Sequence, residues 1–349
     1  MSIVINVAYP FAPVSDATPG GAEQIVFSID SELSDRNHRS IVIAQEGSQV
    51  KGELIKVSKI SGLIDERGKK EIQLNVKVLL ENAIDKYRPD LLHFHGLDFY
   101  DYLPDTKTKS LATLHLPINF YDRDRLNLCS TYYVSVSLSQ RNNCSEIKRL
   151  LPDIVQNGVQ IPISINRKKN PKFAFSLGRI CPEKGYHIAI DAAKKAQVPF
   201  ILAGEVFNYT DHIDYYQSEI KPRMDSVDYR FIGKIGSIQK KYLYNNALCV
   251  LIPSQIEETS SLVAMEALAH GTPVIASGRG ALGEIIQDGF NGFLVRTVNE
   301  MAEAIGKIHL IDAKNCFSTA KEKYDRQLMT NKYLEIYEKL KKTTEMLGC

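Results

Sequence analysis

The sequence has no apolar run long enough to cross a membrane. Its longest runs, such as residues 247–253, fall far short of the ~20 residues that a spanning helix needs. The first seven residues contain no basic stretch of the signal-peptide kind and are typical of a first β-strand. These absences predict a cytoplasmic protein, for which peripheral contact with a membrane surface stays open.

Closely spaced cysteines and an excess of one charge are also lacking. The six cysteines form no C-x-x-C pair, which predicts reduced thiols and not a disulfide framework. Lys and Arg number 43 against 41 Asp and Glu, a formal net charge of +2. Residues 1–162 carry 18 basic against 20 acidic residues and the remainder 25 against 21, so neither part resembles a nucleic-acid binder. We therefore expect no nucleic-acid partner.

What the sequence does contain is a regular alternation of short β-branched runs and helical patterns. A chain of 349 residues usually forms two domains, and this alternation is typical of parallel sheets built from βαβ units. In the first half, strands are expected at residues 3–8, 39–44, 91–95, 110–114 and 132–136, and helices at 21–33 and 73–86. The Pro- and Lys-rich residues 162–171 are expected to form an interdomain linker.

The alternation starts again after this linker. Strands are expected at residues 173–177, 199–203, 229–232, 248–252 and 273–276, and helices at 185–196, 262–269 and 332–342. We predict an α/β protein with two Rossmann-like domains, residues 1–162 and 163–330, and with the C-terminal helix, 331–349, packed back on the first domain. The parallel sheets of two such domains are expected to face each other across a cleft at the carboxyl ends of their strands.

Two glutamates mark the most informative segment. A strand ends at Pro253 and a helix is expected to begin near Ser260, so Glu258 lies in the loop and Glu266 about two turns further along. At ~1.5 Å per residue the offset is at most ~12 Å, whereas the paired carboxylates of glycoside hydrolases stand about 5–9.5 Å apart. The offset suits a ligand as long as a sugar, a diphosphate and a ribose. Two solvated glutamates beside an ordinary turn are the alternative.

The residues around these glutamates resemble the retaining GT-B glycosyltransferases of the family 4 type, also called glycosyl transferases group 1. The hallmark of that family is E-x7-E followed by E-A-x-A-x-G-x-P-V, which is matched here by Glu258, Glu266, Ala267, Ala269, Gly271, Pro273 and Val274. The resemblance implies the GT-B fold. It also implies that Glu258 contacts the hydroxyls of the donor sugar and Glu266 those of the ribose.

The expected cradle for the donor lies between the two glutamates. Where many relatives have a Gly-Phe-Gly loop, this chain has Thr259, Ser260 and Ser261. The backbone N–H groups of Ser260, Ser261 and Leu262 are expected to form the N-terminus of a helix, which favours phosphate. The cradle would therefore use serine hydroxyls in addition to backbone groups.

A second match follows the first strand of the second domain. Gly178, Arg179 and Lys184 fit the family's G-R-x-x-x-x-K-G pattern. The two cations can neutralise a leaving diphosphate, work that a divalent metal performs in other transferases; exposed surface cations are the alternative. The resemblance implies that they clamp the pyrophosphate, and that Gly233 lines the nucleobase pocket through backbone groups.

The first domain has weaker signals. Gly20 and Gly21 follow the first strand and open a helix, where they permit close approach of a phosphate or sugar, although a flexible turn explains them equally well. They match the family's G-G-x-E loop. His115 ends a strand at the expected edge of the cleft, and in related enzymes a histidine here contacts the donor sugar near its reacting carbon.

Two patterns imitate metal motifs. His93 and His95 lie on one face of a strand and could start a zinc site with His115, although hydrogen-bonded histidines at a strand end are more common. Asp122 and Asp124 imitate a D-x-D motif but follow a polar, aromatic loop, so we interpret them as a solvated turn. We therefore expect no metal site.

The resemblance implies a metal-independent, retaining enzyme that transfers a hexose from a nucleoside diphosphate sugar. A UDP-sugar is favoured, no cofactor is expected, and the acceptor would be a saccharide or a lipid-linked molecule of polysaccharide biosynthesis. The catalytic candidates are His115, Arg179, Lys184 and Glu258. A sugar-nucleotide epimerase or a phosphorylase of the same fold is an alternative, and so is a non-catalytic partner subunit that binds nucleotide sugars.

Overall fold

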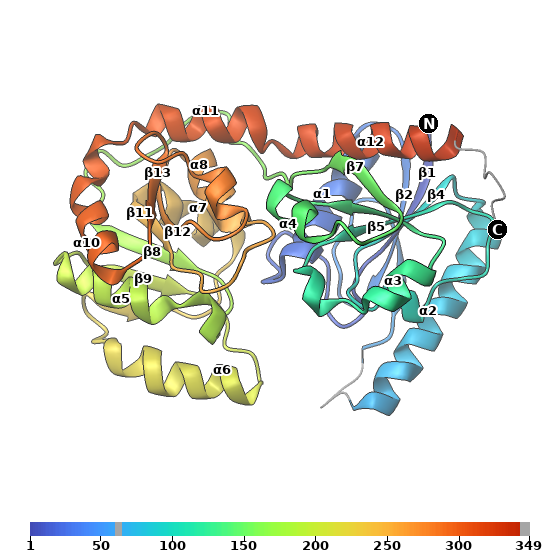
Figure 1. Cartoon of the computed structure of the whole chain (residues 1–349), viewed down its shortest axis with the longest axis horizontal. Coiled ribbons are helices and arrows are strands. Elements are labelled where there is room, and N and C mark those ends of the chain that lie inside the picture. The colour runs from blue at the N-terminus through green and yellow to red at the C-terminus, as the bar shows by residue number, and fades with distance from the viewer. Residues whose placement is uncertain (60–64, 343–349) are drawn as a thin grey trace. The chain divides into compact units, whose positions relative to one another are not determined.

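The computed structural model describes residues 1–59 and 65–342 and consists of two compact units (Figure 1). The first unit comprises Met1–Asn157 together with the chain from Arg326 onward, and the second comprises Gly158–Asp325. Both units are built from a parallel sheet with helices. The chain thus leaves the first unit once and returns to it after the second unit is complete.

The sheet of the first unit has the strand order β3-β2-β1-β4-β5-β6-β7. Its strands are β1 (Ile3–Val7), β2 (Arg39–Gln45), β3 (Glu53–Val57), β4 (Leu91–Phe94), β5 (Ser110–Leu114), β6 (Tyr132–Ser135) and β7 (Leu150–Ile154). The chain winds outward from β1 to β3 and then crosses back to β4, from which it continues to β7. The order therefore reverses between β1 and β4, where sheets of this kind form a crevice for ligands.

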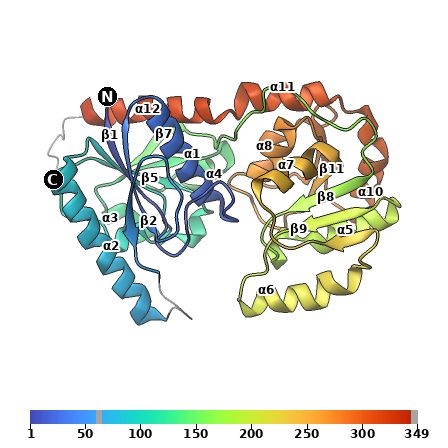
Figure 2. The same ribbon diagram turned by 180° about the vertical axis from the view of Figure 1, so that it is seen from behind.

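Helices cover both faces of this sheet. They are α1 (Gly21–Asp35), α2 (Glu66–Tyr87), α3 (Arg123–Leu128), α4 (Leu138–Asn143) and α12 (Arg326–Lys342). Ile41 and Ile43 of β2 pack in one hydrophobic cluster with α2, whereas Val42 and Ala44 point to the opposite face and pack with α1. Figure 1 shows α3 and α4 toward the viewer, and Figure 2, from behind, shows α1 toward the viewer.

Two buried tyrosines tie α12 to the sheet of the first unit. The hydroxyl of Tyr337 lies 2.8 Å from Nδ1 of His93 on β4, and that of Tyr333 lies 3.0 Å from Oγ1 of Thr113 on β5. Both tyrosines are fully buried. These contacts explain why the chain returns to the first unit at its last described helix.

The sheet of the second unit has the order β10-β9-β8-β11-β12-β13. Its strands are β8 (Phe173–Leu177), β9 (Phe200–Ala203), β10 (Tyr229–Phe231), β11 (Ala247–Ile252), β12 (Val274–Ser277) and β13 (Gly292–Val295). Its helices are α5 (Tyr186–Lys195), α6 (Thr210–Tyr215), α7 (Ser237–Asn246), α8 (Leu262–Ala269), α9 (Leu282–Ile285), α10 (Val298–Lys307) and α11 (Ala313–Lys323). The strand order reverses between the neighbours β8 and β11.

Some boundaries differ from the expectations. The compact units divide at residues 157/158, so the expected linker, 162–171, lies within the second unit. Arg167 fixes it there, because its guanidinium donates to Oγ1 of Thr272 at 2.6 Å and to the carbonyl of Leu248 at 2.7 Å. The predicted helix 332–342 begins earlier, at Arg326, and residues 343–349 of the predicted segment lie outside the described residues.

None of the helices in residues 1–59 and 65–342 combines the length and apolar character that crossing a membrane requires.

Candidate functional site

The predicted site residues of the second unit follow the two central strands of its sheet. Arg179 and Lys184 come after β8, and Glu258 and Glu266 come after β11. Because the strand order reverses between these hydrogen-bonded neighbours, their carboxyl ends form the crevice in which open α/β sheets bind ligands. The sheet therefore unites two motifs that are distant in sequence.

Lys184 and Glu258 form an ion pair at this crevice. Lys184 ends a 3₁₀ turn, Pro182–Lys184, and its Nζ lies 2.6 Å from Oε1 of Glu258. The two side chains are only 24% and 10% exposed. The backbone also holds Glu258, because its carbonyl accepts a hydrogen bond from the N–H of Ala281 at 2.8 Å. Partial shielding from water strengthens the attraction between the charges, so the pair holds both side chains in place.

Backbone contacts keep the loops after β8 and β11 together. The N–H of Gln255 donates to the carbonyl of Glu183 at 2.7 Å. Gly185 has a φ of +64°, and a Cβ there would lie 2.5 Å from the carbonyl oxygen of Pro253. A side chain at position 185 would therefore both strain the backbone and push the loops apart.

Arg179 stands at the start of the same loop. It is half-buried and directly follows Gly178, whose φ is +150°. Among the described residues its guanidinium has no ion-pair partner, unlike the ammonium of Lys184. The loop thus offers one cation that a carboxylate already neutralises and one that is available to an anion.

The helix after Glu258 begins slightly later than the sequence predicts. Ser261 is the residue that caps α8, and its Oγ accepts a hydrogen bond from the N–H of Ala264 at 3.3 Å. This hydroxyl therefore satisfies a helix N–H group itself. The Oγ of Ser260 is buried and has no hydrogen-bond partner within the described residues. Of the two serine hydroxyls expected in the cradle, that of Ser260 is the one left for a ligand, next to the half-buried Thr259 and Leu262.

Two side chains of α7 bind the carboxylate of Glu266. The Nζ of Lys240 lies 2.6 Å from Oε1, and the hydroxyl of Tyr244 donates to Oε2 at 2.9 Å. Burial and the neighbouring Glu266 raise the pKa of Tyr244, so its hydroxyl keeps its proton. The carboxylate is therefore fixed in orientation, and its side chain remains 16% exposed.

The loops after β9 and β10 pack backbone against backbone beside β8. The N–H of Gly204 donates to the carbonyl of Gly233 at 2.9 Å, and a Cβ at Gly204 would collide with the carbonyl oxygen of Gly178. At Gly233, which has a φ of +70°, no described atom lies within 4 Å of where a Cβ would be. The Cα of Gly233 is thus open on the side where a Cβ would point, which leaves room for its predicted contact with a nucleobase.

In the first unit, three histidines meet at the carboxyl ends of β4 and β5. The ring centroids of His93 and His95 lie 4.0 Å apart, and Nδ1 of His95 lies 3.0 Å from Nε2 of His115. Burial lowers the pKa of His115 from 6.5 to about 4, and it also holds the pKa values of His93 and His95 well below their usual range. All three rings are therefore neutral at pH 7.

The zinc hypothesis for these histidines does not suit His93. Its Nδ1 lies 2.8 Å from the hydroxyl of Tyr337 and its Nε2 lies 2.8 Å from Oγ1 of Thr113. With both ring nitrogens engaged, His93 has no lone pair for a metal. The arrangement is that of hydrogen-bonded histidines at a strand end.

Two other expected features of the first unit are helix N-termini. Gly20 caps α1 and Gly21 is its first residue, and the buried carboxylate of Glu23 occupies the place where a Cβ at position 20 would be. The Glu23 carboxyl group thus lies directly beside the loop and takes up the space next to Gly20. Asp122 caps α3 by accepting a hydrogen bond from the N–H of Arg125 at 3.2 Å, so the D-x-D pattern here begins a helix.

Acidification is expected to weaken the first unit through His115. With a pKa of about 4 in the folded state against 6.5 as its ordinary value, the folded chain binds fewer protons between these values. Its contribution to stability is therefore complete above pH 6.5 and is lost as the pH falls toward 4. We expect the urea midpoint of the wild type to fall between pH 7 and pH 5, and that of His115→Gln to fall less. Parallel falls in the two proteins would contradict the depressed pKa.

Some residues that bind the candidate site residues were not predicted from the sequence. Lys240 and Tyr244 bind Glu266 from a helix that was not predicted; their i, i+4 spacing, which places them on one helical face, is a signal that could have found them. Arg279, whose guanidinium donates to the carbonyl of Gln255 at 3.0 Å, carries no such signal, because it lies in a loop.

A family model described as Glycosyl transferases group 1 matches residues 160–322, which is nearly the whole of the second unit. Among curated proteins, the lipopolysaccharide 1,2-N-acetylglucosaminetransferase of Salmonella typhimurium is 24% identical over 293 residues, which cover 78% of this chain and 72% of that protein. An uncharacterized glycosyltransferase of Methanocaldococcus jannaschii is 28% identical over 166 residues, 48% of this chain and 45% of its own length. The match thus spans about half of the second relative.

Solved structures resemble the whole described fold. The structure of the Anabaena protein HepE in complex with UDP-glucose has a TM-score of 0.74 and 18% identity to this chain, over 97% of this chain and 100% of that one. Such a likeness identifies the architecture of two Rossmann-like units as the GT-B fold, in agreement with the prediction.

Proposed function

We propose that this chain, a glycosyltransferase whose residues 160–322 belong to the glycosyl transferases group 1, transfers a hexose from a nucleoside diphosphate sugar. The transfer retains the configuration of the sugar. The donor is a UDP-sugar, and the acceptor is a saccharide or a lipid-linked molecule. The chain uses no cofactor, and its own cations take the place of a metal on the diphosphate.

The observation that carries this proposal is the Lys184–Glu258 ion pair at the reversal between β8 and β11. A donor needs a carboxylate for its sugar hydroxyls and cations for its diphosphate within one donor length. Here the carboxylate and one cation touch, and Arg179 lies in the same loop. A bound diphosphate would replace Glu258 as the partner of Lys184, which frees the carboxylate for the sugar.

The residues suggest how the reaction proceeds. The bond from the anomeric carbon to the diphosphate oxygen breaks, while a bond from the same face forms to the acceptor oxygen. The acceptor's proton passes to the leaving diphosphate. Arg179, Lys184 and the N-terminus of α8 stabilise the charge that develops there. His115 of the first unit is neutral at pH 7, so it can donate or accept a hydrogen bond without adding charge.

The identity of the donor base rests on similarity. HepE was solved with UDP-glucose, and the Salmonella relative is named for the transfer of N-acetylglucosamine. A UDP-hexose or its N-acetyl derivative is therefore our first candidate for this chain. The scattered cysteines favour a cytoplasmic location, where a lipid-linked acceptor would require peripheral contact with a membrane.

A panel of UDP-, GDP- and ADP-sugars tests the proposal by thermal unfolding. A donor that binds only the folded chain stabilises it by about 2.7 kcal/mol at a concentration of 100 Kd. We expect one nucleotide class to raise the Tm and to be consumed with an acceptor, at a rate that added Mg²⁺ or Mn²⁺ leaves unchanged. A panel in which no donor raises the Tm would contradict the proposal.

The same assay distinguishes the alternatives. Conversion of the donor without an acceptor would indicate an epimerase, and dependence on inorganic phosphate would indicate a phosphorylase. Binding without any turnover, across a broad set of acceptors, would indicate a non-catalytic subunit.

A further inference from the structure

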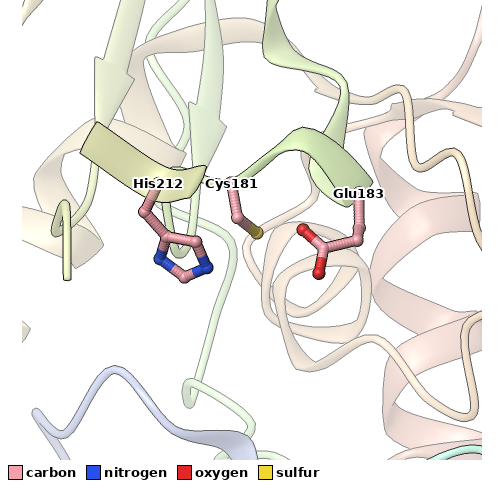
Figure 3. Close-up of side chains that lie close together, drawn as sticks. All are labelled: Cys181, Glu183 and His212. Atoms are coloured by element: carbon pink, nitrogen blue, oxygen red, sulfur yellow. The ribbon is translucent and has the colours of Figure 1, made fainter. Parts of the chain in front are cut away.

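A second cluster of chemically active side chains lies beside the loop that carries Arg179 and Lys184. Cys181 and Glu183 belong to this loop, and His212 belongs to α6 (Figure 3). One potential ligand atom from each of the three residues lies within 4.8 Å of the other two. In Figure 3 the sulfur of Cys181 lies between the ring of His212 and the carboxylate of Glu183.

Two of the three residues are buried, Glu183 is half-buried, and some polar atoms of the cluster lack partners. Cys181 is 0% and His212 4% exposed. Oε2 of Glu183 and Nδ1 of His212 are both buried without a hydrogen-bond partner among the described residues. The other ring nitrogen of His212, Nε2, is 4.0 Å from the nearest carboxylate oxygen, which belongs to Asp211. A buried polar atom without a hydrogen-bond partner destabilises the folded chain, so the grouping of such atoms here needs an explanation.

Aromatic neighbours hold the ring of His212 in place. Tyr209 lies edge-on to it at a centroid distance of 5.2 Å, and Phe207 at 6.2 Å. A ring that is fixed by packing, and whose nitrogens form no hydrogen bond within residues 1–59 and 65–342, is preorganised to receive a ligand. The thiol of Cys181 makes a weak 3.6 Å hydrogen bond to the carbonyl of Arg179 and also interacts with the carboxylate of Glu183, so two of the three residues already meet.

We propose that Cys181, Glu183 and His212 bind a divalent cation of the zinc class. Thiolate, imidazole and carboxylate are the ligands that Zn²⁺ takes, and three of them leave a fourth tetrahedral position for water. The thiol of Cys181 releases its proton to solvent on binding. One thiolate and one carboxylate together neutralise the two positive charges of the ion. Without the ion, the same two negative charges would be costly to bury.

The ion would join two separate elements of the second unit. Two ligands flank Pro182 in the loop between Arg179 and Lys184, and the third lies on α6. Binding would tie that loop to α6 and limit the motion of both cations. The site goes beyond the proposed function and does not depend on it, because metal binding is measured without any sugar donor.

Metal titration of the untagged, full-length chain tests the proposal. After treatment with a chelator, the wild type is expected to take up one equivalent of Zn²⁺ in competition with a chromophoric chelator. Substitution of a residue that only supports a metal ligand weakens metal binding by roughly 10–100-fold. Cys181→Ser and His212→Gln, which each remove a proposed ligand, are expected to weaken Zn²⁺ binding by more than this. Cys249→Ala removes another fully buried cysteine of the same unit and should bind as the wild type does.

Cobalt(II) supplies a direct readout of the sulfur ligand. The wild type and Cys249→Ala are expected to show the near-ultraviolet charge-transfer band of a thiolate–cobalt bond, and Cys181→Ser is expected to lack it. Circular dichroism of each variant checks that it is folded. A wild type that takes up no Zn²⁺, or a band that persists in folded Cys181→Ser, would overturn the site. Neither result would bear on glycosyl transfer, which the donor panel tests separately.

Discussion

Lys184→Ala is expected to lower kcat about 10²–10³-fold, the usual effect of removing one group that stabilises charge in a transition state. The ammonium of Lys184 stands at the reversal between β8 and β11, where the diphosphate charge would develop. Because this charge is greater in the transition state than in the bound donor, the loss should appear mainly in kcat and less in KM. Steady-state kinetics with the donor identified by thermal unfolding measures both.

The control for Lys184→Ala must separate chemistry from folding. The substitution leaves Glu258 buried without its cation, which by itself destabilises the chain. Lys184→Ala/Glu258→Gln removes that unpaired charge, and a thermal melt shows whether each variant is folded. Lys195→Ala, which removes an exposed lysine of α5, should keep the kcat of the wild type. Unchanged turnover in folded Lys184→Ala would remove Lys184 from the clamp.

Glu266→Ala is expected to raise the donor Kd about 10–100-fold while kcat changes little. A hydrogen bond to a charged group contributes about 1.5–3 kcal/mol, and each 1.4 kcal/mol corresponds to a factor of ten. The ribose does not change during the reaction, so its contacts stabilise the ground state and the transition state alike. Calorimetric titration of the nucleoside diphosphate measures the affinity without turnover.

Two further variants sharpen this test. Glu266→Gln keeps an oxygen that can accept the hydrogen bond from Tyr244, but it removes the charge that pairs with Lys240. We expect its affinity to lie between those of the wild type and Glu266→Ala. Glu303→Gln changes an exposed glutamate of α10 and serves as the matched control. A fall confined to kcat in Glu266→Ala would assign Glu266 to the chemistry and not to the ribose.

The strands at the centre of both sheets could be predicted from the sequence because they are buried on both faces. β5 and β8 begin and end at the predicted residues, and α8, whose apolar face is continuous, ends where predicted and begins at Leu262, slightly after Ser260. The elements that were missed lack such a signal. β3 is an edge strand with a largely exposed or half-buried surface, and α7 buries only Leu243 and Tyr244 among ten mostly polar residues. Tertiary contacts, and not local pattern, decide these elements.

The sequence could propose residue types for the candidate site but not their pairings. The spacing of Glu258 and Glu266 makes both carboxylates candidates, yet it contains no information about their partners. Lys184 reaches Glu258 because β8 and β11 are neighbours, and strand order is a property of the folded sheet. His212 joins Cys181 through the same kind of long-range packing. Local sequence therefore proposes candidate groups, and topology decides which of these groups meet.

The return of α12 to the first unit has a consequence for how the chain is made. His93 and Thr113 form hydrogen bonds with Tyr337 and Tyr333, which lie 244 and 220 residues further along the chain. At roughly 5–20 residues per second, a ribosome needs about 10–50 s to supply them. During this interval Gly158–Asp325 emerges and can fold by itself, while the earlier half exposes the apolar surface that α12 later covers. The nascent chain therefore passes through a stage at which its younger part has been synthesised and its older part still lacks α12.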